Sequence, residues 1–121
     1  MTILVVDDDL AVLNVLERLL KVRGYVVLTA QDSLEAALVL SQQIRPPDLL
    51  LVDVALKDEN GVEYAERFRA RYPATAIVLT TGFIDREPVA ARRGLGPVLR
   101  KPFEPNELYA IIDALERREP A

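Results

Sequence analysis

Short apolar runs alternate along the chain with segments in which apolar residues recur every three or four positions. The runs are rich in β-branched residues and occupy positions 3–6, 26–28, 49–52, 76–79 and 98–99. Runs of this kind predict strands that are buried on both faces of a parallel sheet. The first two segments between them predict amphipathic helices, with apolar residues at Leu13, Leu16 and Leu20 and at Leu34, Ala37 and Leu38.

Residues that favour caps and turns mark the ends of these two helices. Gly24 can close the first helix in the left-handed conformation. Asp32 followed by Glu35 forms a variant of the capping box that opens the second helix. The Pro46-Pro47 pair prevents that helix from continuing.

The second half of the chain predicts three more helices. The third follows Gly61 and stops at Pro73, with apolar positions at Val62, Ala65, Phe68 and Tyr72. The last begins at Pro105 and reaches about Arg118, with a buried stripe of Leu108, Ile111, Ile112 and Leu115. Between them, residues 82–96 predict only a short or irregular fourth helix, because they contain Gly82, Pro88, Gly94 and Gly96.

Strand and helix thus alternate five times, which predicts an α/β fold. We expect one domain over residues 1–121, a doubly wound five-stranded parallel sheet covered by five helices, with no output domain in this chain. A chain of 121 residues, half of them hydrophobic, can bury a sufficient core without disulfides.

Composition excludes several kinds of chemistry. The chain contains neither cysteine nor histidine, so thiolate sites, histidine metal centres and Ser-His-Asp triads are ruled out. The formal net charge of −4 argues against direct binding to nucleic acid. No apolar run is long enough to span a bilayer and no signal peptide is recognisable, so we expect a cytoplasmic protein without membrane insertion.

The polar residues that follow the predicted strands are the candidates for function. In an open α/β sheet, ligands bind outside the carboxyl ends of the strands. The residues at these ends are Asp7-Asp8-Asp9, Asp53, Thr80-Thr81-Gly82 and Arg100-Lys101-Pro102. Such clustered carboxylates need a positive partner, and an all-oxygen site suits Mg²⁺ better than zinc or copper.

Each of these residues also has an ordinary structural explanation. Carboxylates after a strand are often helix caps, and Asp9 fits that description. Thr81 and Lys101 taken singly would be unremarkable. Asp53 is harder to explain in this way, because it lies within an apolar stretch where an unpaired charge would be costly.

In these residues the chain resembles the response-regulator receiver family, over its whole length. The resemblance rests on residues 5–9 and 48–53, on Gly61 eight positions after Asp53, on Thr81-Gly82, and on Lys101-Pro102-Phe103. It implies a flavodoxin-like strand order 2-1-3-4-5. The short fourth helix is similar to that of receivers attached to hybrid histidine kinases and of some stand-alone receivers.

The resemblance also implies a role for each site residue. Asp53 would be the phosphoacceptor and Lys101 would pair with the phosphoryl group. Thr81, rather than the competing Thr80, would donate its hydroxyl to a phosphoryl oxygen. Mg²⁺ would be held directly by Asp8 and Asp53, through water by Asp7, and by the backbone carbonyl of Ala55. The Lys101-Pro102 peptide would be cis.

Two positions and one spacing depart from the family pattern. Lys57 replaces the usual proline four positions after the phosphoacceptor, and Val98 replaces the usual aromatic switch residue. Only 20 positions separate Thr81 from Lys101 (101 − 81), about two fewer than usual for the family, and the shortfall lies in the fourth helix. Because valine has no ring that could turn inward or outward, any activation relay that runs through position 98 must differ from the one usual in the family.

The function expected from these features is a phosphorylation-switched receiver in a two-component His-to-Asp phosphorelay, not an enzyme acting on other substrates. Its partners would be a sensor histidine kinase or a histidine phosphotransfer protein, and an unnamed downstream protein. Two alternatives stay open: a Mg²⁺-dependent hydrolase with an aspartyl-phosphate intermediate, and a receiver-like binding module that is not phosphorylated. The hydrolase would need a cap segment, and intact Asp7, Asp8, Asp53, Thr81 and Lys101 argue against the binding module.

Overall fold

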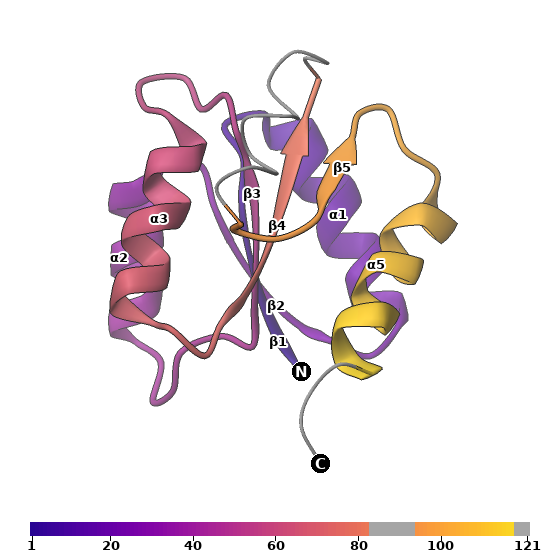
Figure 1. Ribbon diagram of the computed structural model, residues 1–121, viewed down its shortest axis with the longest axis horizontal. Helices are drawn as coiled ribbons and strands as arrows, with labels where there is room; N and C mark the ends of the chain where they lie inside the picture. Colours follow the sequence, from indigo (N-terminus) through magenta and orange to yellow (C-terminus); the bar gives the residue numbers. More distant parts are fainter. Residues whose placement is uncertain (83–93, 118–121) are drawn as a thin grey trace.

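The computed structural model describes residues 1–82 and 94–117 (Figure 1). Its elements in chain order are β1 (Thr2–Val6), α1 (Leu10–Val22), β2 (Val26–Ala30), α2 (Ser33–Ser41), β3 (Leu49–Asp53), α3 (Gly61–Arg71), β4 (Ala76–Thr81), β5 (Val98–Arg100) and α5 (Pro105–Arg117). The expected fourth helix falls mainly on residues 83–93, which lie outside the described part of the chain.

The five strands form one parallel sheet in the order β2-β1-β3-β4-β5. This confirms the expected doubly wound, flavodoxin-like topology. Helices α2 and α3 cover one face of the sheet, and α1 and α5 cover the other (Figure 1). Because both faces are covered, β3 is buried at every position, which explains its continuous apolar run.

The helix ends follow the caps expected from the sequence. Asp9 caps α1 by accepting hydrogen bonds from the backbone N–H groups of Ala11 and Val12. Asp32 accepts from the N–H of Glu35 at the start of α2. Gly24 has a φ of +86°, the left-handed conformation expected after the first helix.

The buried face of α2 was predicted wrongly. Leu34 and Leu38 are 71% and 61% exposed, whereas Ala36 is buried and Leu40 packs against the core. The helix is apolar on nearly all sides, so the spacing of its leucines could not show which side faces the sheet. The face of α2 that points to solvent is therefore unusually apolar.

Contacts between α5 and the C-terminal end of α1 join two parts of the chain that lie far apart in sequence. Arg23 forms an ion pair with Asp113 at 2.6 Å, and its guanidinium lies 4.5 Å from the ring centroid of Tyr109. The Tyr109 hydroxyl donates to the carbonyl oxygen of Leu19 at 2.8 Å. These contacts fix α5 against α1.

Neither these helices nor any other in residues 1–82 and 94–117 is long and apolar enough to cross a membrane.

Candidate functional site

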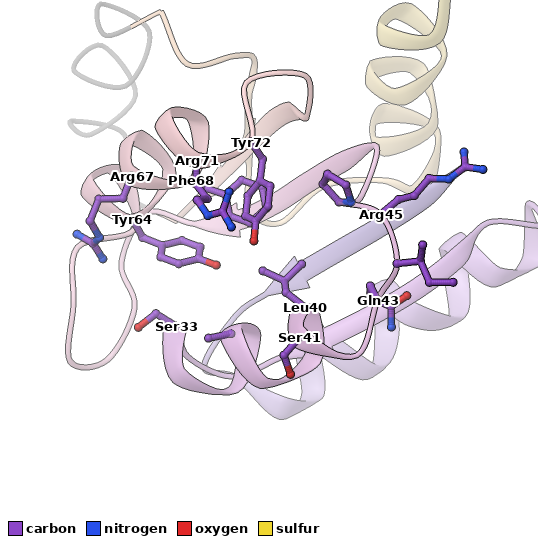
Figure 2. A pocket seen from close by; sticks show the side chains of 13 residues that line it. Ser33, Leu40, Ser41, Gln43, Arg45, Tyr64, Arg67, Phe68, Arg71 and Tyr72 are labelled. Carbon is purple, nitrogen blue, oxygen red and sulfur yellow. The ribbon is translucent and has the colours of Figure 1, made fainter.

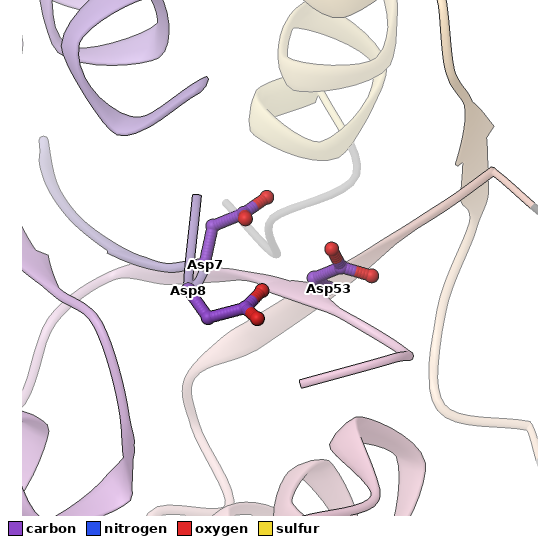
Figure 3. A group of neighbouring side chains, drawn as sticks. All are labelled: Asp7, Asp8 and Asp53. Atoms are coloured by element: carbon purple, nitrogen blue, oxygen red, sulfur yellow. The ribbon is translucent and has the colours of Figure 1, made fainter. Parts of the chain in front are cut away.

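Three carboxylates meet at the carboxyl ends of β1 and β3. Asp7 and Asp8 directly follow β1, and Asp53 is the last residue of β3 (Figure 3). One carboxylate oxygen from each residue lies within 4.8 Å of the others. The parallel register brings them together because β1 and β3 are adjacent strands. The structure therefore assembles the acidic cluster that the sequence predicts.

Lys101 lies between two of these carboxylates. Its ammonium nitrogen is 2.8 Å from Asp7 Oδ2 and 2.9 Å from Asp53 Oδ2. Burial raises the pKa of Asp7 above its ordinary value, although the hydrogen bond from Lys101 opposes this. Burial alone would lower the pKa of Lys101, but its hydrogen bonds to both carboxylates outweigh burial and raise it. Lys101 is therefore held as a cation at the site. The Lys101-Pro102 peptide bond is cis.

Backbone groups fix the remaining carboxylate oxygens. The N–H of Asp9 donates to Asp7 Oδ1 at 2.9 Å, and the N–H of Ala55 donates to Asp53 Oδ1 at 2.9 Å. Asp7 and Asp53 are thus each held by one backbone donor and by Lys101. Both side chains are oriented before any ligand arrives.

The loop between β3 and α3 folds tightly against Asp53. Ala55 pairs with Asn60 in an antiparallel bridge, and the N–H of Gly61 donates to the carbonyl oxygen of Val54 at 2.9 Å. Asn60 also caps α3. We did not single out Asn60 from the sequence, although an asparagine directly before a helix is a recognisable cap signal.

Alternation along the strands separates the two threonines at the end of β4. Val78 packs on the α1–α5 side of the sheet and Leu79 on the α2–α3 side. Thr80 therefore points to the same side as Asp53, its partner in the register, and Thr81 points to the other side. Both threonine side chains are buried at the end of the strand. The register therefore favours Thr80, and not the expected Thr81, as the hydroxyl beside Asp53.

The donor set fits a hard divalent cation. Three carboxylates face one another and Lys101 pairs with two of them, while no cation in the described segments forms an ion pair with Asp8. One ammonium leaves the cluster with excess negative charge, and an all-oxygen donor set is the kind that Mg²⁺ prefers. The position of Ala55 next to Asp53 also leaves its carbonyl as a candidate ligand.

Comparisons with known proteins agree with this arrangement. The family model for the response regulator receiver domain matches residues 3–113. The photosynthetic apparatus regulatory protein RegA of Cereibacter sphaeroides is 37% identical over 114 residues, covering 92% of this chain and 61% of that protein. The transcriptional regulatory protein CpxR of Klebsiella pneumoniae is 35% identical over 117 residues, covering 96% of this chain and 49% of that protein.

A solved structure shows the same architecture. A response regulator receiver domain protein from Clostridium thermocellum superposes with a TM-score of 0.83 at 28% identity, and the match covers 97% of this chain and 95% of that one. The present chain spans only about half to three fifths of the length of the two curated relatives.

Proposed function

The chain belongs to the response regulator receiver domain family, and on this premise we propose that Asp53 accepts a phosphoryl group in a His-to-Asp phosphorelay. The observation that carries the proposal is the geometry of Asp53, whose carboxylate is fixed by Lys101 and Ala55 beside Asp7 and Asp8. The chain has no histidine. A sensor histidine kinase or a histidine phosphotransfer protein therefore supplies the phosphoryl group.

In the proposed transfer, a carboxylate oxygen of Asp53 attacks phosphorus in line with the phosphohistidine nitrogen. The new O–P bond forms as the P–N bond breaks, and the histidine nitrogen keeps the electron pair. Lys101 neutralises charge on the phosphoryl oxygens, because it already lies 2.9 Å from Asp53. Asp7 holds Lys101 in that position.

The same site would hold Mg²⁺ through Asp8 and Asp53, through water at Asp7, and through the carbonyl of Ala55. When bound, Mg²⁺ supplies positive charge that offsets the charge on the phosphoryl oxygens. Thr80, which points to the same side of the sheet as Asp53, donates its hydroxyl to the phosphoryl group after transfer, which biases the surrounding surface between two states. The output is a changed protein-binding surface.

Incubation with a small-molecule phosphodonor and Mg²⁺, followed by intact mass measurement, tests the assignment. We expect the wild-type chain to gain the mass of one phosphoryl group and Asp53→Asn to gain none. A gain that survives in Asp53→Asn would place the phosphoacceptor elsewhere. No gain in the wild type would favour the binding module that is not phosphorylated.

Mg²⁺ should stabilise the fold, because the carboxylate cluster exists only in the native state. At ten times the dissociation constant, the free energy of unfolding should rise by about 1.4 kcal/mol. Thermal unfolding with and without Mg²⁺ measures the gain, and Asp8→Ala should abolish it. An unchanged midpoint in the wild type would contradict the metal site.

Thr81 and Thr80 can be separated by comparing Thr81→Ala with Thr80→Ala. Both variants should still gain one phosphoryl group, since neither threonine is the acceptor. Thr80→Ala should lose most of the chemical-shift change that phosphorylation produces in nuclear magnetic resonance spectra, because Thr80 points to the Asp53 side of the sheet, whereas Thr81→Ala should keep it. The reverse pattern would assign the switch to Thr81, on the opposite side of the sheet.

The lifetime of the phosphorylated state should depend on the residue at position 55. Ala55 has no polar group that could position an attacking water, and the chain offers no histidine as a general base. Ala55→Gln should speed loss of the phosphoryl group about tenfold, followed as loss of the added mass over time. A rate equal to that of the wild type would show that another group controls hydrolysis. The sequence also suggests that Phe83 covers the phosphoryl group with apolar surface, but this residue lies outside the described residues.

A further inference from the structure

A groove of about 530 Å³ lies between α2 and α3, on the side of the sheet away from Lys101. Figure 2 shows the side chains that line it. Its volume falls in the range of about 300–1,000 Å³ that is typical of ligand sites. The phosphotransfer chemistry proposed above uses none of its lining residues.

Helix α3 and its C-cap residue, Tyr72, contribute an aromatic ladder and a parallel stripe of arginines to this groove. The ring centroids of Tyr64 and Phe68 are 6.0 Å apart, and those of Phe68 and Tyr72 are 4.8 Å apart. Arg67 lies over the ring of Tyr64 at 5.9 Å, and Arg71 lies over the ring of Tyr72 at 5.1 Å. The two guanidinium groups belong to residues one helical turn apart.

Three side chains in the groove carry hydrogen-bond donors that none of the described residues accepts from. The hydroxyls of Tyr64 and Tyr72 point toward α2 (Figure 2), and neither has a hydrogen-bond partner among residues 1–82 and 94–117. Burial raises the pKa of Tyr64 to about 12, so its hydroxyl stays protonated. Arg71 forms no ion pair with any carboxylate in the same two segments. The groove therefore offers donors and positive charge to a ligand.

Arg67 is held only weakly by its own chain. Its nearest carboxylate oxygen, Glu59 Oε1, is 3.7 Å away, which is too long for a direct hydrogen bond. That buried oxygen has no other partner in the described part of the chain, while Glu59 Oε2 accepts from the Ser33 hydroxyl at 2.7 Å. Arg67 can therefore turn toward a better-placed carboxylate.

The far rim adds apolar surface and a further positive charge. Leu40 lies opposite the aromatic ladder, and Ile44 is fully exposed in the segment after α2. Arg45 lies at the same rim, with its side chain pointing away from the α3 arginines (Figure 2). A ligand for this groove needs both carboxylates and an apolar group.

We propose that the α2–α3 groove binds an acidic segment of a partner protein, with two carboxylates one helical turn apart and an apolar side chain between them. Each carboxylate forms a two-pronged ion pair with Arg67 or Arg71. The apolar side chain packs on Leu40 and the ring of Tyr72. The net charge of −4 on the whole chain disfavours non-specific binding of acidic peptides, so recognition depends on this local patch.

The test uses a fluorescently labelled peptide in which two glutamates four positions apart flank a leucine, with binding followed by anisotropy. The double variant Arg67→Gln/Arg71→Gln should bind it at least about tenfold more weakly than the wild type. The matched control is Arg18→Gln, which removes an exposed arginine from α1 and should change the affinity less than about twofold. A second peptide with glutamine in place of both glutamates should lose binding to the same extent as the double variant.

Three results would overturn the proposal: no binding of the acidic peptide, equal binding by the double variant, or equal binding of the glutamine peptide. Displacement of the peptide by lower concentrations of ATP or pyrophosphate would assign the groove to a small anion instead. None of these measurements requires phosphorylation of Asp53. The binding result therefore stands or falls independently of the phosphorelay function.

Discussion

Replacement of Lys101 by methionine is expected to lower the free energy of unfolding by about 3 kcal/mol at neutral pH. The Lys101 ammonium is the cation that pairs with Asp7 and Asp53, and the Asp7 side chain is only 1% exposed. Methionine keeps most of the side-chain volume but leaves a buried carboxylate without its counter-charge. Denaturant unfolding of the two proteins measures the difference.

The pH dependence of this loss identifies its cause. Burial already raises the pKa of Asp7 above 3.8, so the fold loses stability as the pH rises from 3.8 to the folded-state pKa of Asp7. Removing Lys101 increases that cost, and the deficit should shrink as the pH falls toward 3.8. In the wild type, the raised pKa of Lys101 means that its contribution is complete below pH 10.5 and is lost at higher pH.

A surface lysine provides the control. Lys21 forms an exposed ion pair with Glu17 at 2.9 Å, so Lys21→Met should cost less than about 1 kcal/mol. A pH-independent loss in Lys101→Met, or an equal loss in both variants, would show that the buried charges are not responsible.

Replacement of Gly61 by alanine is expected to cost about 3 kcal/mol of stability and to disturb the site. A Cβ atom at this position would lie 1.8 Å from the carbonyl oxygen of Asp53. The next nearest atoms, the carbonyl carbon of Asp53 and Cα of Val54, also belong to the backbone. The start of α3 would have to move away from β3, breaking the hydrogen bond from Gly61 to Val54. The midpoint of chemical denaturation should fall, and phosphorylation of Asp53 should become slower.

Gly82→Ala is the matched control, because a Cβ at Gly82 would meet no atom of residues 1–82 or 94–117 within 4 Å and its φ is not in the left-handed region. Its stability should differ from the wild type by less than about 0.5 kcal/mol. If Gly61→Ala were equally harmless, the close approach of α3 to Asp53 would not be essential to the fold.

The sequence predicted the sheet well because both of its faces are buried. Continuous apolar runs such as residues 49–52 can occupy few other positions in a domain of this size. Helix α1 was equally clear, since Leu13, Leu16 and Leu20 form a single stripe and all three are buried. Helix α2 was not, because its apolar residues surround the axis and only packing decides which of them face the sheet.

The sequence could predict which residues form the site, but not which of them contact one another. Asp7, Asp53 and Lys101 follow strands, and strand ends share one edge of the sheet. The sequence could not show that Lys101 bridges Asp7 and Asp53, because the strand register decides which carboxylates it reaches. Gly61 was noticed only through its spacing from Asp53, and the short distance to the Asp53 carbonyl supplies the physical reason.

The contacts between α1 and α5 also bear on how the chain is made. β1 and α1 are synthesised before α5, yet α5 is needed to cover the apolar side on which Leu13, Leu16 and Leu20 lie. The ion pair of Arg23 with Asp113 and the hydrogen bond from Tyr109 to the Leu19 carbonyl also cannot form before α5 has been synthesised. On the ribosome this apolar side stays uncovered until α5 has emerged. Truncated chains that end before Pro105 would therefore expose it to chaperones and proteases.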